Sequence, residues 1–337
     1  LPPGTARALS PDSQGRMVWT NLEAVTRHPP INDDGSNTLV EVSTASGRTV
    51  VVTKGKSLLV ERDGELVQVG GGDVAVGDRV PVGCSLPADA STLDLRTVFS
   101  PTEAIFTDVA IEAVRMAETD RHWFHTGKFA HRCCYARSDA LLHASKHREG
   151  LLVPHRVTLR HGGAFLPQDV PLDRDFGFFV GAYLAQGYCT ESQVHIANND
   201  SEYRQAAGAW CVRNGVQQWH GTAAARRHEN KGTSISTMFR STLIASLLKR
   251  TCGHLPQHKR VPGWAMSAPD AFVLGLLDAY LSGDGTVAQA RSSASSRSRN
   301  LRDGIALLLT RVGVDSSLSM DYRQQHVHSD GTQTPTG

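Results

Sequence analysis

FFVGAYLAQG (178–187) and LLDAYLSGDG (276–285) are two stretches of the same build, each an apolar helical segment that ends in glycine. Small residues recur four positions apart in both stretches: Gly181 and Ala185 in the first, Ala279 and Gly283 in the second. That spacing puts the small side chains on one helix face. We therefore predict two related helices that cross with their backbones in close contact.

This crossing is expected to bring together the residues that precede the final glycines, Gln186 and Asp284. Acidic side chains at such a point supply the oxygen ligands for a divalent metal, as phosphodiester cleavage requires. Taken alone, an Asp in Ser-Gly-Asp-Gly is an ordinary turn residue. The repetition of the whole segment is what favours a functional interpretation.

The chain from 173 to 321 alternates helices with strands. Periodicity and turn residues predict five helices, at 175–187, 200–215, 240–253, 267–285 and 300–313. Gly215 is a glycine of the type that ends helices. Strands are predicted at 192–199, 216–224, 233–239, 286–290 and 314–320, with a Ser/Arg-rich loop at 291–299.

The first 95 residues are rich in β-branched residues, which predict strands within 37–46 and 47–69 and a hairpin turn at Asp63-Gly64. Alternating valines at 74–83 predict two more strands around a tight turn. Between these regions we expect a helix at 108–118, a second helix from Ser138, and an extended, loop-like segment at 151–172.

Four blocks in this order resemble the two motifs and intervening segments of LAGLIDADG (dodecapeptide, DOD-type) homing endonucleases: 166–187, 258–264, 271–287 and 298–314. The resemblance implies an α+β protein with a pseudo-two-fold αββαββα endonuclease domain at 171–321. It further implies hydrolysis of phosphodiester bonds in double-stranded DNA at a specific target site, with Mg²⁺ or another divalent cation.

The N-terminal segments TNLEAVTRHPP, SGRTVVVTKGKSLLV and DVAVGDRVPV resemble the β-rich splicing (Hint) domain of inteins, most closely those of RNA polymerase large subunits. The implied organisation is a partial Hint domain at 1–95, a linker or DNA-recognition region at 96–170, the endonuclease at 171–321 and a polar tail at 322–337. The implied partners are a DNA target site and the exteins of a polymerase-like host.

The splicing pattern is degenerate. Thr53 matches the Thr of the second splicing block, but Lys56 stands where the family has a His. The family has Cys or Ser at residue one, where this chain has Leu1, and it ends on His-Asn, whereas this chain ends on TQTPTG. Together with the missing initiator Met, this leads us to expect an intein fragment that lacks both ends and does not splice as it stands.

The resemblance assigns catalysis to Asp284, Gln186 and Lys259, and metal binding to the two motif ends, Gln186-Gly187 and Asp284-Gly285. The family has an acid where this chain has Gln186, so we expect weak, nicking-only or absent cleavage with DNA binding retained. The alternative is a catalytically decayed nucleic-acid-binding relative. Lys259 is expected near the scissile phosphate, where it stabilises developing charge.

In this family each half-domain presents a β-ribbon to the major groove. The basic residues that we expect to contact DNA are Arg226, Arg227, Lys231, Arg240, Arg291, Arg297 and Arg299.

Composition sets the outer limits. The 337 residues are 40% hydrophobic and 20% charged, which allows packed domains and argues against disorder. No apolar run approaches the roughly 20 residues of a membrane span, so no membrane contact is expected. The net charge of +2 means that DNA contact must depend on local basic residues. We expect a monomer.

Six cysteines without a regular spacing favour an intracellular, reducing setting, with the compartment following that of the host protein. A His/Cys-rich stretch at 122–147 leaves open a third class, a zinc-dependent protein. Its alternative is an Arg/His-rich surface between domains.

Overall fold

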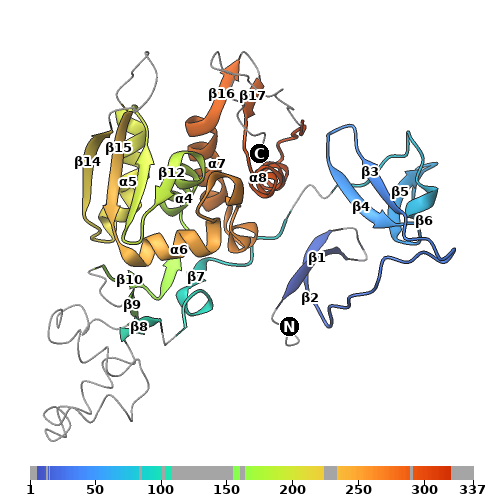
Figure 1. The fold of residues 1–337 in the computed structure, drawn as a ribbon, viewed down its shortest axis with the longest axis horizontal. Coiled ribbons are helices and arrows are strands. Elements are labelled where there is room, and N and C mark those ends of the chain that lie inside the picture. The colour runs from blue at the N-terminus through green and yellow to red at the C-terminus, as the bar shows by residue number, and fades with distance from the viewer. Residues whose placement is uncertain are drawn as a thin grey trace, which may run out of the picture. The chain divides into compact units, whose positions relative to one another are not determined.

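The fold is described from a computed structural model of the chain. The structure describes residues 6–12, 14, 16–82, 86–100, 103–107, 155–159, 164–223, 234–288 and 291–319. The chain divides into two compact units, one drawn from residues 1–87 and 306–337 and the other from 88–305. Helices and small antiparallel sheets make the architecture α+β, as predicted (Figure 1).

The larger unit begins with short strands and continues as an alternation of helices and antiparallel strands. Its elements are β7 (Thr92–Asp94), η2 (Leu95–Thr97), β8 (Ala104–Phe106), β9 (Arg156–Leu159), β10 (Leu166–Pro167), β11 (Asp169–Pro171), α4 (Arg174–Gln186), β12 (Gly187–Cys189), β13 (Gln193–Ala197), α5 (Ser201–Arg213), β14 (Gln218–Ala223), β15 (Ser234–Arg240), α6 (Thr242–Cys252), η4 (Pro256–His258), η5 (Gly263–Ser267), α7 (Asp270–Asp284), β16 (Gly285–Ala288) and β17 (Arg291–Ala294). Helix α8 (Arg299–Arg311) crosses the boundary between the two units.

The five helices predicted between residues 173 and 321 are all present, whereas those predicted at 108–118 and from Ser138 lie outside the described residues. Side-chain caps start three of them: Asp173, Asp200 and Ser241 each accept a hydrogen bond from a backbone N–H of the first turn of α4, α5 and α6. Gly215 follows α5 with a φ of +69°, as its predicted role requires. In the described residues, no helix is long and apolar enough to cross a bilayer.

The two halves of the predicted repeat differ in size. The first runs α4–β12–β13–α5–β14–β15–α6, with sheet order β12-β13-β15-β14, whereas the second runs α7–β16–β17–α8 within the described residues. The prediction of a strand at 314–320 is wrong, because the described residues 314–319 pair with no other strand. The Ser/Arg-rich loop predicted from 291 begins instead as β17, whose backbone pairs with β16.

Helices α4 and α7 lie side by side, with the four-stranded sheet on one side and the β16–β17 hairpin on the other (Figure 1). A Cβ on Gly177 would lie 2.1 Å from the carbonyl oxygen of Phe272, and one on Gly181 would lie 2.2 Å from that of Leu276. A Cβ on Gly283 would lie 2.8 Å from Cβ of Ala185. The predicted close crossing of the two helices, backbone against backbone, is therefore confirmed.

Aromatic side chains fill the space between these helices and the sheet. Phe176 and Phe179 of α4 stack on Trp210 of α5, with ring centroids 4.5 and 5.3 Å apart, and Phe179 meets Phe239 of β15 edge-on. All four rings are essentially inaccessible to solvent. This core fixes α4, and with it the first motif, against the sheet.

Three hairpins form the smaller unit's strands in the residues that the structure describes. Its strands are β1 (Arg7–Pro11), β2 (Met17–Asn21), β3 (Leu39–Ser43), β4 (Thr49–Thr53), β5 (Ser57–Arg62) and β6 (Glu65–Gly70), followed by the short helix η1 (Gly71–Asp73). The predicted turn at Asp63-Gly64 is confirmed, with both residues at positive φ. The strands predicted at 74–83 are wrong over the described residues 74–82: Asp78 binds Arg62 and the backbone N–H of Ala75 in a turn, and Arg79 forms only an isolated bridge with Glu61 of β5.

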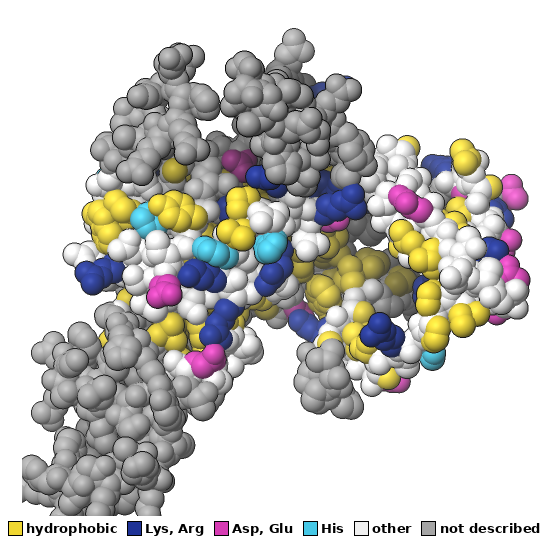
Figure 2. Space-filling model, in the orientation of Figure 1, with side chains coloured by type: hydrophobic (Ala, Val, Ile, Leu, Met, Phe, Trp, Pro, Cys, Tyr) yellow, Lys and Arg dark blue, Asp and Glu magenta, His cyan; other side chains and the backbone are white. Residues whose placement is uncertain are grey.

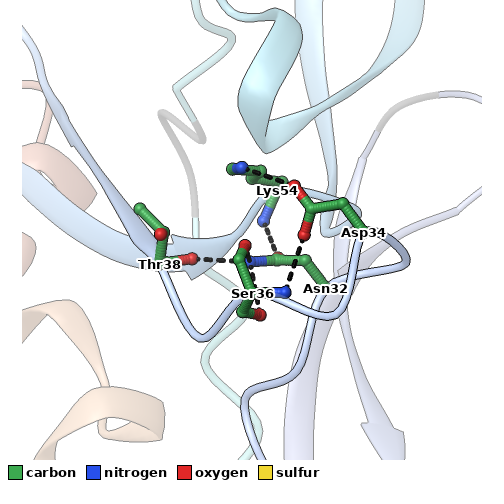
Figure 3. Close-up of polar contacts among 5 residues, drawn as sticks. All are labelled: Asn32, Asp34, Ser36, Thr38 and Lys54. Atoms are coloured by element: carbon green, nitrogen blue, oxygen red, sulfur yellow. Dashed lines mark hydrogen bonds and ion pairs between the residues drawn. The ribbon is translucent and has the colours of Figure 1, made fainter.

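Asn32 organises the loop before β3 (Figure 3). Its Nδ2 donates to the carbonyl oxygens of Ser36 and Thr38, and its Oδ1 accepts from the backbone N–H of Lys54 at 2.8 Å. The Lys54 ammonium binds Asp34 at 2.8 Å and holds the pKa of that carboxyl below its usual value. This buried amide therefore ties the loop to the end of β4.

Residues from the C-terminal part of the chain pack on the turn between β3 and β4. Leu318 N donates to the Ser46 carbonyl oxygen at 2.7 Å, and the Arg48 guanidinium binds Thr310 Oγ1 and the Ser316 carbonyl oxygen. Gly47, at φ +79°, leaves no room for a Cβ against Leu318. The smaller unit is therefore assembled from two separate parts of the chain.

Candidate functional site

The two central helices end in the same way. Gly187 follows α4 at φ −90°, ψ 154°, and Gly285 follows α7 at φ −86°, ψ 156°. Each glycine N–H donates back into its helix, to Tyr183 and Leu281 respectively. A Cβ on Gly285 would lie 2.1 Å from the Leu281 carbonyl oxygen, so this sharp exit into a strand requires glycine.

Gln186 spans the junction between the helix ends. Its Nε2 donates to the carbonyl oxygen of Gly283 at 2.7 Å, and its Oε1 accepts from Nδ2 of Asn198 at 3.0 Å. Both ends of the amide are thus engaged, and the donor end faces a carbonyl oxygen. The structure brings Gln186 to the residue adjoining Asp284, which is the juxtaposition that the sequence predicts.

Asp284 supplies a carboxylate at this junction. Its side chain keeps more than a third of its surface exposed, while partial burial raises the pKa of the carboxyl and the Lys259 ammonium opposes that rise. An accessible carboxyl group therefore lies beside a neutral amide. The chain offers a carboxyl oxygen ligand from the second motif and an amide oxygen, already bound to Asn198, from the first.

Lys259 lies beneath the end of α4 and is only 5% exposed. Its Nζ donates to the carbonyl oxygens of Tyr183 and Leu184, at 2.8 and 2.9 Å, and lies over the Tyr183 ring. Burial lowers the pKa of Lys259 to about 8, although the nearby charge of Asp284 acts to raise it. In this geometry the lysine caps the last turn of α4, the end of the helix at which the helix dipole stabilises a positive charge.

Two side chains that the sequence analysis did not single out support the same junction. Asn198, directly after β13, holds the Gln186 oxygen. Tyr203 of α5 donates from its hydroxyl to the Ala279 carbonyl oxygen at 2.9 Å, and a Cβ on Gly283 would lie 2.7 Å from that hydroxyl. Their only sequence signal is their place after a predicted strand and within a predicted helix.

The described cysteine, histidine and acidic side chains do not favour a metal site built from a group of them. Burial raises the pKa of Cys189 to about 11 and that of Cys252 to about 12, so both are neutral thiols at pH 7. Within the residues placed by the structure, no group of three or more His, Cys, Asp or Glu side chains is arranged to hold an ion. The His/Cys stretch at 122–147 lies outside the described residues.

Four of the basic residues predicted to contact DNA are visible, and all four are exposed: Arg240 at the end of β15, Arg291 in β17, Arg297, and Arg299 at the start of α8. The others, Arg226, Arg227 and Lys231, lie outside the described residues. On the face shown in Figure 2, Lys and Arg side chains are dispersed among hydrophobic and polar ones and form no single patch.

The residues assigned to splicing lie in the smaller unit. Thr53 ends β4, opposite Leu39, and Lys56 is exposed in the turn that follows, where its N–H donates to the Thr53 carbonyl oxygen. Two residues of the same block are therefore adjacent. Their roles in splicing stay a prediction.

Comparison with known proteins places a family motif on the second half of the site. Residues 271–330, which include α7, Asp284, β16, β17 and α8, match the LAGLIDADG-like domain. The chain therefore carries a LAGLIDADG-like domain, and the match includes the second of the two predicted motifs.

The relatives are archaeal polymerase proteins. The chain is 25% identical over 313 residues to DNA-directed RNA polymerase subunit Rpo1C of Methanocaldococcus jannaschii, covering 92% of this chain and 30% of that protein. It is 25% identical over 331 residues to the DNA polymerase II large subunit of Thermococcus kodakarensis, covering 93% of this chain and 17% of that protein. A DNA polymerase of Thermococcus sp. (strain GE8) is 23% identical over 82% of this chain and 20% of its own length. The chain thus spans less than a third of these relatives.

Proposed function

We propose that this chain, which carries a LAGLIDADG-like domain, is the DNA-recognising endonuclease module of an intein whose double-strand cleavage is lost through Gln186. Recognition of a specific duplex site is retained, and cleavage is limited to nicking by the half of the site that holds Asp284. The alternative, a fully decayed nucleic-acid-binding protein, differs in predicting no cleavage of either strand.

The proposal rests on the two hydrogen bonds of the Gln186 side-chain amide, to the Gly283 carbonyl oxygen and from Asn198. A carboxylate at this position would place an anionic oxygen against the carbonyl oxygen of Gly283, now 2.7 Å from Nε2. The local structure is therefore suited to an amide, which donates as well as accepts. Its oxygen is neutral and already accepts from Asn198, so it binds a divalent cation more weakly than a carboxylate would.

A divalent cation such as Mg²⁺ supplies charge stabilisation and an activated water in phosphodiester hydrolysis. The residues at this junction do not fit a metal site shared by two carboxylates, because Asp284 brings a carboxyl group whereas Gln186 brings a neutral amide. Gly187 and Gly285 allow the chain to turn sharply where α4 and α7 end. Lys259 acts in this proposal as a positioning residue, since its buried Nζ holds the last turn of α4.

The polymerase names of the relatives support an intein within a polymerase-like host, since 82–93% of this chain aligns to only 17–30% of those proteins. The β-rich first 95 residues represent the Hint part in this proposal, and residues 171–321 the endonuclease. The partners are then a double-stranded DNA site and the host exteins, and the cellular compartment is that of the host.

The experiment starts from the full chain and a pool of duplexes with a randomised central segment. Repeated selection is expected to converge on one site, whose affinity falls steeply as salt rises. A matched single strand and a scrambled duplex serve as controls. Failure to converge, or a flat response to salt, would sink the recognition part of the proposal.

A further inference from the structure

A row of large side chains crosses the four-stranded sheet, with one residue from each strand. Tyr188 of β12 lies opposite His195 of β13, His195 opposite Met238 of β15, and Met238 opposite Trp219 of β14. We call these four residues the aromatic row. Tyr188 is half-exposed, and Met238 and Trp219 are partly exposed.

The aromatic row occupies the sheet face that is turned away from the helices. Val194, Ile196 and Phe239 are fully buried, and each is adjacent in its strand to a member of the row. Because successive side chains of a strand alternate between faces, His195 and Met238 point to the opposite side. Gln218, the neighbour of Trp219, faces α5: a Cβ on Gly208 of α5 would lie 2.4 Å from its Oε1.

Contacts within the face hold the row in place. The Tyr188 ring stacks on the His195 ring, with centroids 4.4 Å apart and planes 12° apart. His195 Nε2 lies 3.1 Å from Gln193 Oε1, and burial lowers the pKa of this imidazole, so it is mainly neutral at pH 7. Met238 extends over Gly221, where a Cβ would lie 2.6 Å from its Cε. The row is therefore an ordered, mostly apolar ridge.

The size and surroundings of the ridge fit the major groove. Four neighbouring strands span about 14 Å, close to the groove width of about 12 Å. Gln193 and Arg240, paired in the adjacent register, add hydrogen-bonding groups to the same face. The β16–β17 hairpin differs: its pairs include Thr286 with Ser293 and Ala288 with Arg291. The two halves of the domain thus present different chemistry.

We propose that the aromatic row reads thymine methyl groups in the half-site contacted by the four-stranded sheet. Among the four bases, thymine alone presents an apolar group, its C5-methyl, in the major groove. A ridge of Tyr, Met and Trp matches that group and offers few donors for guanine or adenine edges. The inference rests on the proposed function, since it assigns base preference to the sheet that would enter the groove.

The test replaces thymine by deoxyuridine, which removes the C5-methyl and leaves the pairing unchanged. The probe is the duplex selected by the full chain, with thymines replaced one at a time. Each replacement under the row is expected to weaken binding about fourfold, the effect of losing one buried methyl. Replacements in the other half-site are expected to leave the affinity unchanged. This arm uses the unmodified protein and does not depend on how any variant folds.

The second arm identifies the reader. In Trp219→Ala and Met238→Ala, deoxyuridine and thymine duplexes are expected to bind equally, whereas Leu274→Ala, which alters an exposed apolar residue of α7, keeps the fourfold difference. Equal binding of both duplexes by the unmodified chain would overturn the inference and leave the proposed function standing. Equally tight binding of the matched single strand would instead count against duplex recognition, and so against the proposed function as well. Absence of any duplex binding would instead remove the proposed function, and the inference with it.

Discussion

Nε2 of Gln186 donates a 2.7 Å hydrogen bond to the carbonyl oxygen of Gly283, and this contact joins the ends of the two central helices. It lies one residue from Asp284, the carboxylate of the second motif. The contact requires a donor at position 186. It therefore links the chemistry of the site to the packing of α4 on α7.

Gln186→Glu is expected to lower the free energy of unfolding by about 1–3 kcal/mol near pH 7, since a carboxylate faces the Gly283 oxygen without a proton to donate. Part of that loss is expected to return at low pH, where the introduced carboxyl is protonated and donates again. Urea unfolding of both proteins at two pH values measures this. A variant as stable as the parent at pH 7 would show that the hydrogen bond contributes nothing.

Gly181→Ala is expected to destabilise the larger unit by about 3 kcal/mol. The added methyl would lie 2.2 Å from the Leu276 carbonyl oxygen, a steric clash that must push the helices apart. Gly263→Ala is the matched control, since a Cβ there meets nothing within 4 Å. Thermal unfolding compares the two. Equal effects would argue against a backbone-to-backbone crossing.

Stability at alkaline pH is expected to depend on Lys259. Burial lowers its pKa from 10.5 to about 8, so between these values the unfolded chain binds more protons than the folded one. The free energy of unfolding therefore rises with pH across this window. The gain is complete above pH 10.5 and is lost as the pH falls through about 8, where the buried lysine becomes charged. Relative to Lys259→Met, the parent is expected to gain about 3 kcal/mol over this window.

Lys259→Arg serves as the control for that measurement, because arginine stays charged throughout the window. Its stability is expected to lack the alkaline rise that the parent shows relative to Lys259→Met. Parallel curves for the parent and both variants would mean that the lysine is not buried as described.

Asn32→Ala is expected to destabilise the loop before β3 by about 2 kcal/mol, because the Lys54 N–H and the Thr38 carbonyl oxygen lose the Asn32 side chain as a partner. The Ser36 carbonyl oxygen loses the Asn32 Nδ2 but keeps the Asn32 backbone N–H. Hydrogen exchange at the Lys54 amide gives a local measurement. Asp34→Asn, which removes only an exposed ion pair, is expected to change that amide little. Similar exchange in both variants would contradict the assigned role of Asn32.

The exposed arginines are expected to set the salt dependence of DNA binding. Replacing by Gln one residue that contacts a phosphate reduces the slope of log K against log salt by about 0.9. The residues to test singly are Arg240, Arg291, Arg297 and Arg299. Arg16, an exposed arginine of the smaller unit paired with Asp12, provides the control. An unchanged slope in all four variants would place the DNA contact elsewhere.

The helices and the crossing were open to prediction because their signals are local: small residues four apart, acidic or hydroxyl caps, and Gly215 after α5. The same holds for Asp63-Gly64, whose preference for positive φ fixes a hairpin. By contrast, β17 was missed, since a Ser/Arg-rich segment becomes a strand only through pairing with β16. The alternating valines at 74–83 failed in the opposite way, because Asp78 holds this segment in a turn with Arg62 and the segment pairs with β5 only at Arg79.

The site shows the same division. Gln186 and Asp284 were placed together by the repeat alone. The partners that decide their chemistry, Asn198 and the Gly283 oxygen, depend on rotamers and helix depth that no sequence pattern records. Lys259 was expected at a phosphate, and its burial beneath α4 depends on how the segment after Gly253 folds back.

The central claim, recognition with a single active carboxylate, is tested most directly by incubating a supercoiled plasmid that carries the selected site with the full chain and Mg²⁺. The account predicts a nicked circle, no linear product, and loss of nicking in Asp284→Asn. Gln186→Glu, compared in the same assay, reports whether a second carboxylate restores cutting of both strands. Vigorous linearisation by the unmodified chain, equal to that of Gln186→Glu, would contradict the account.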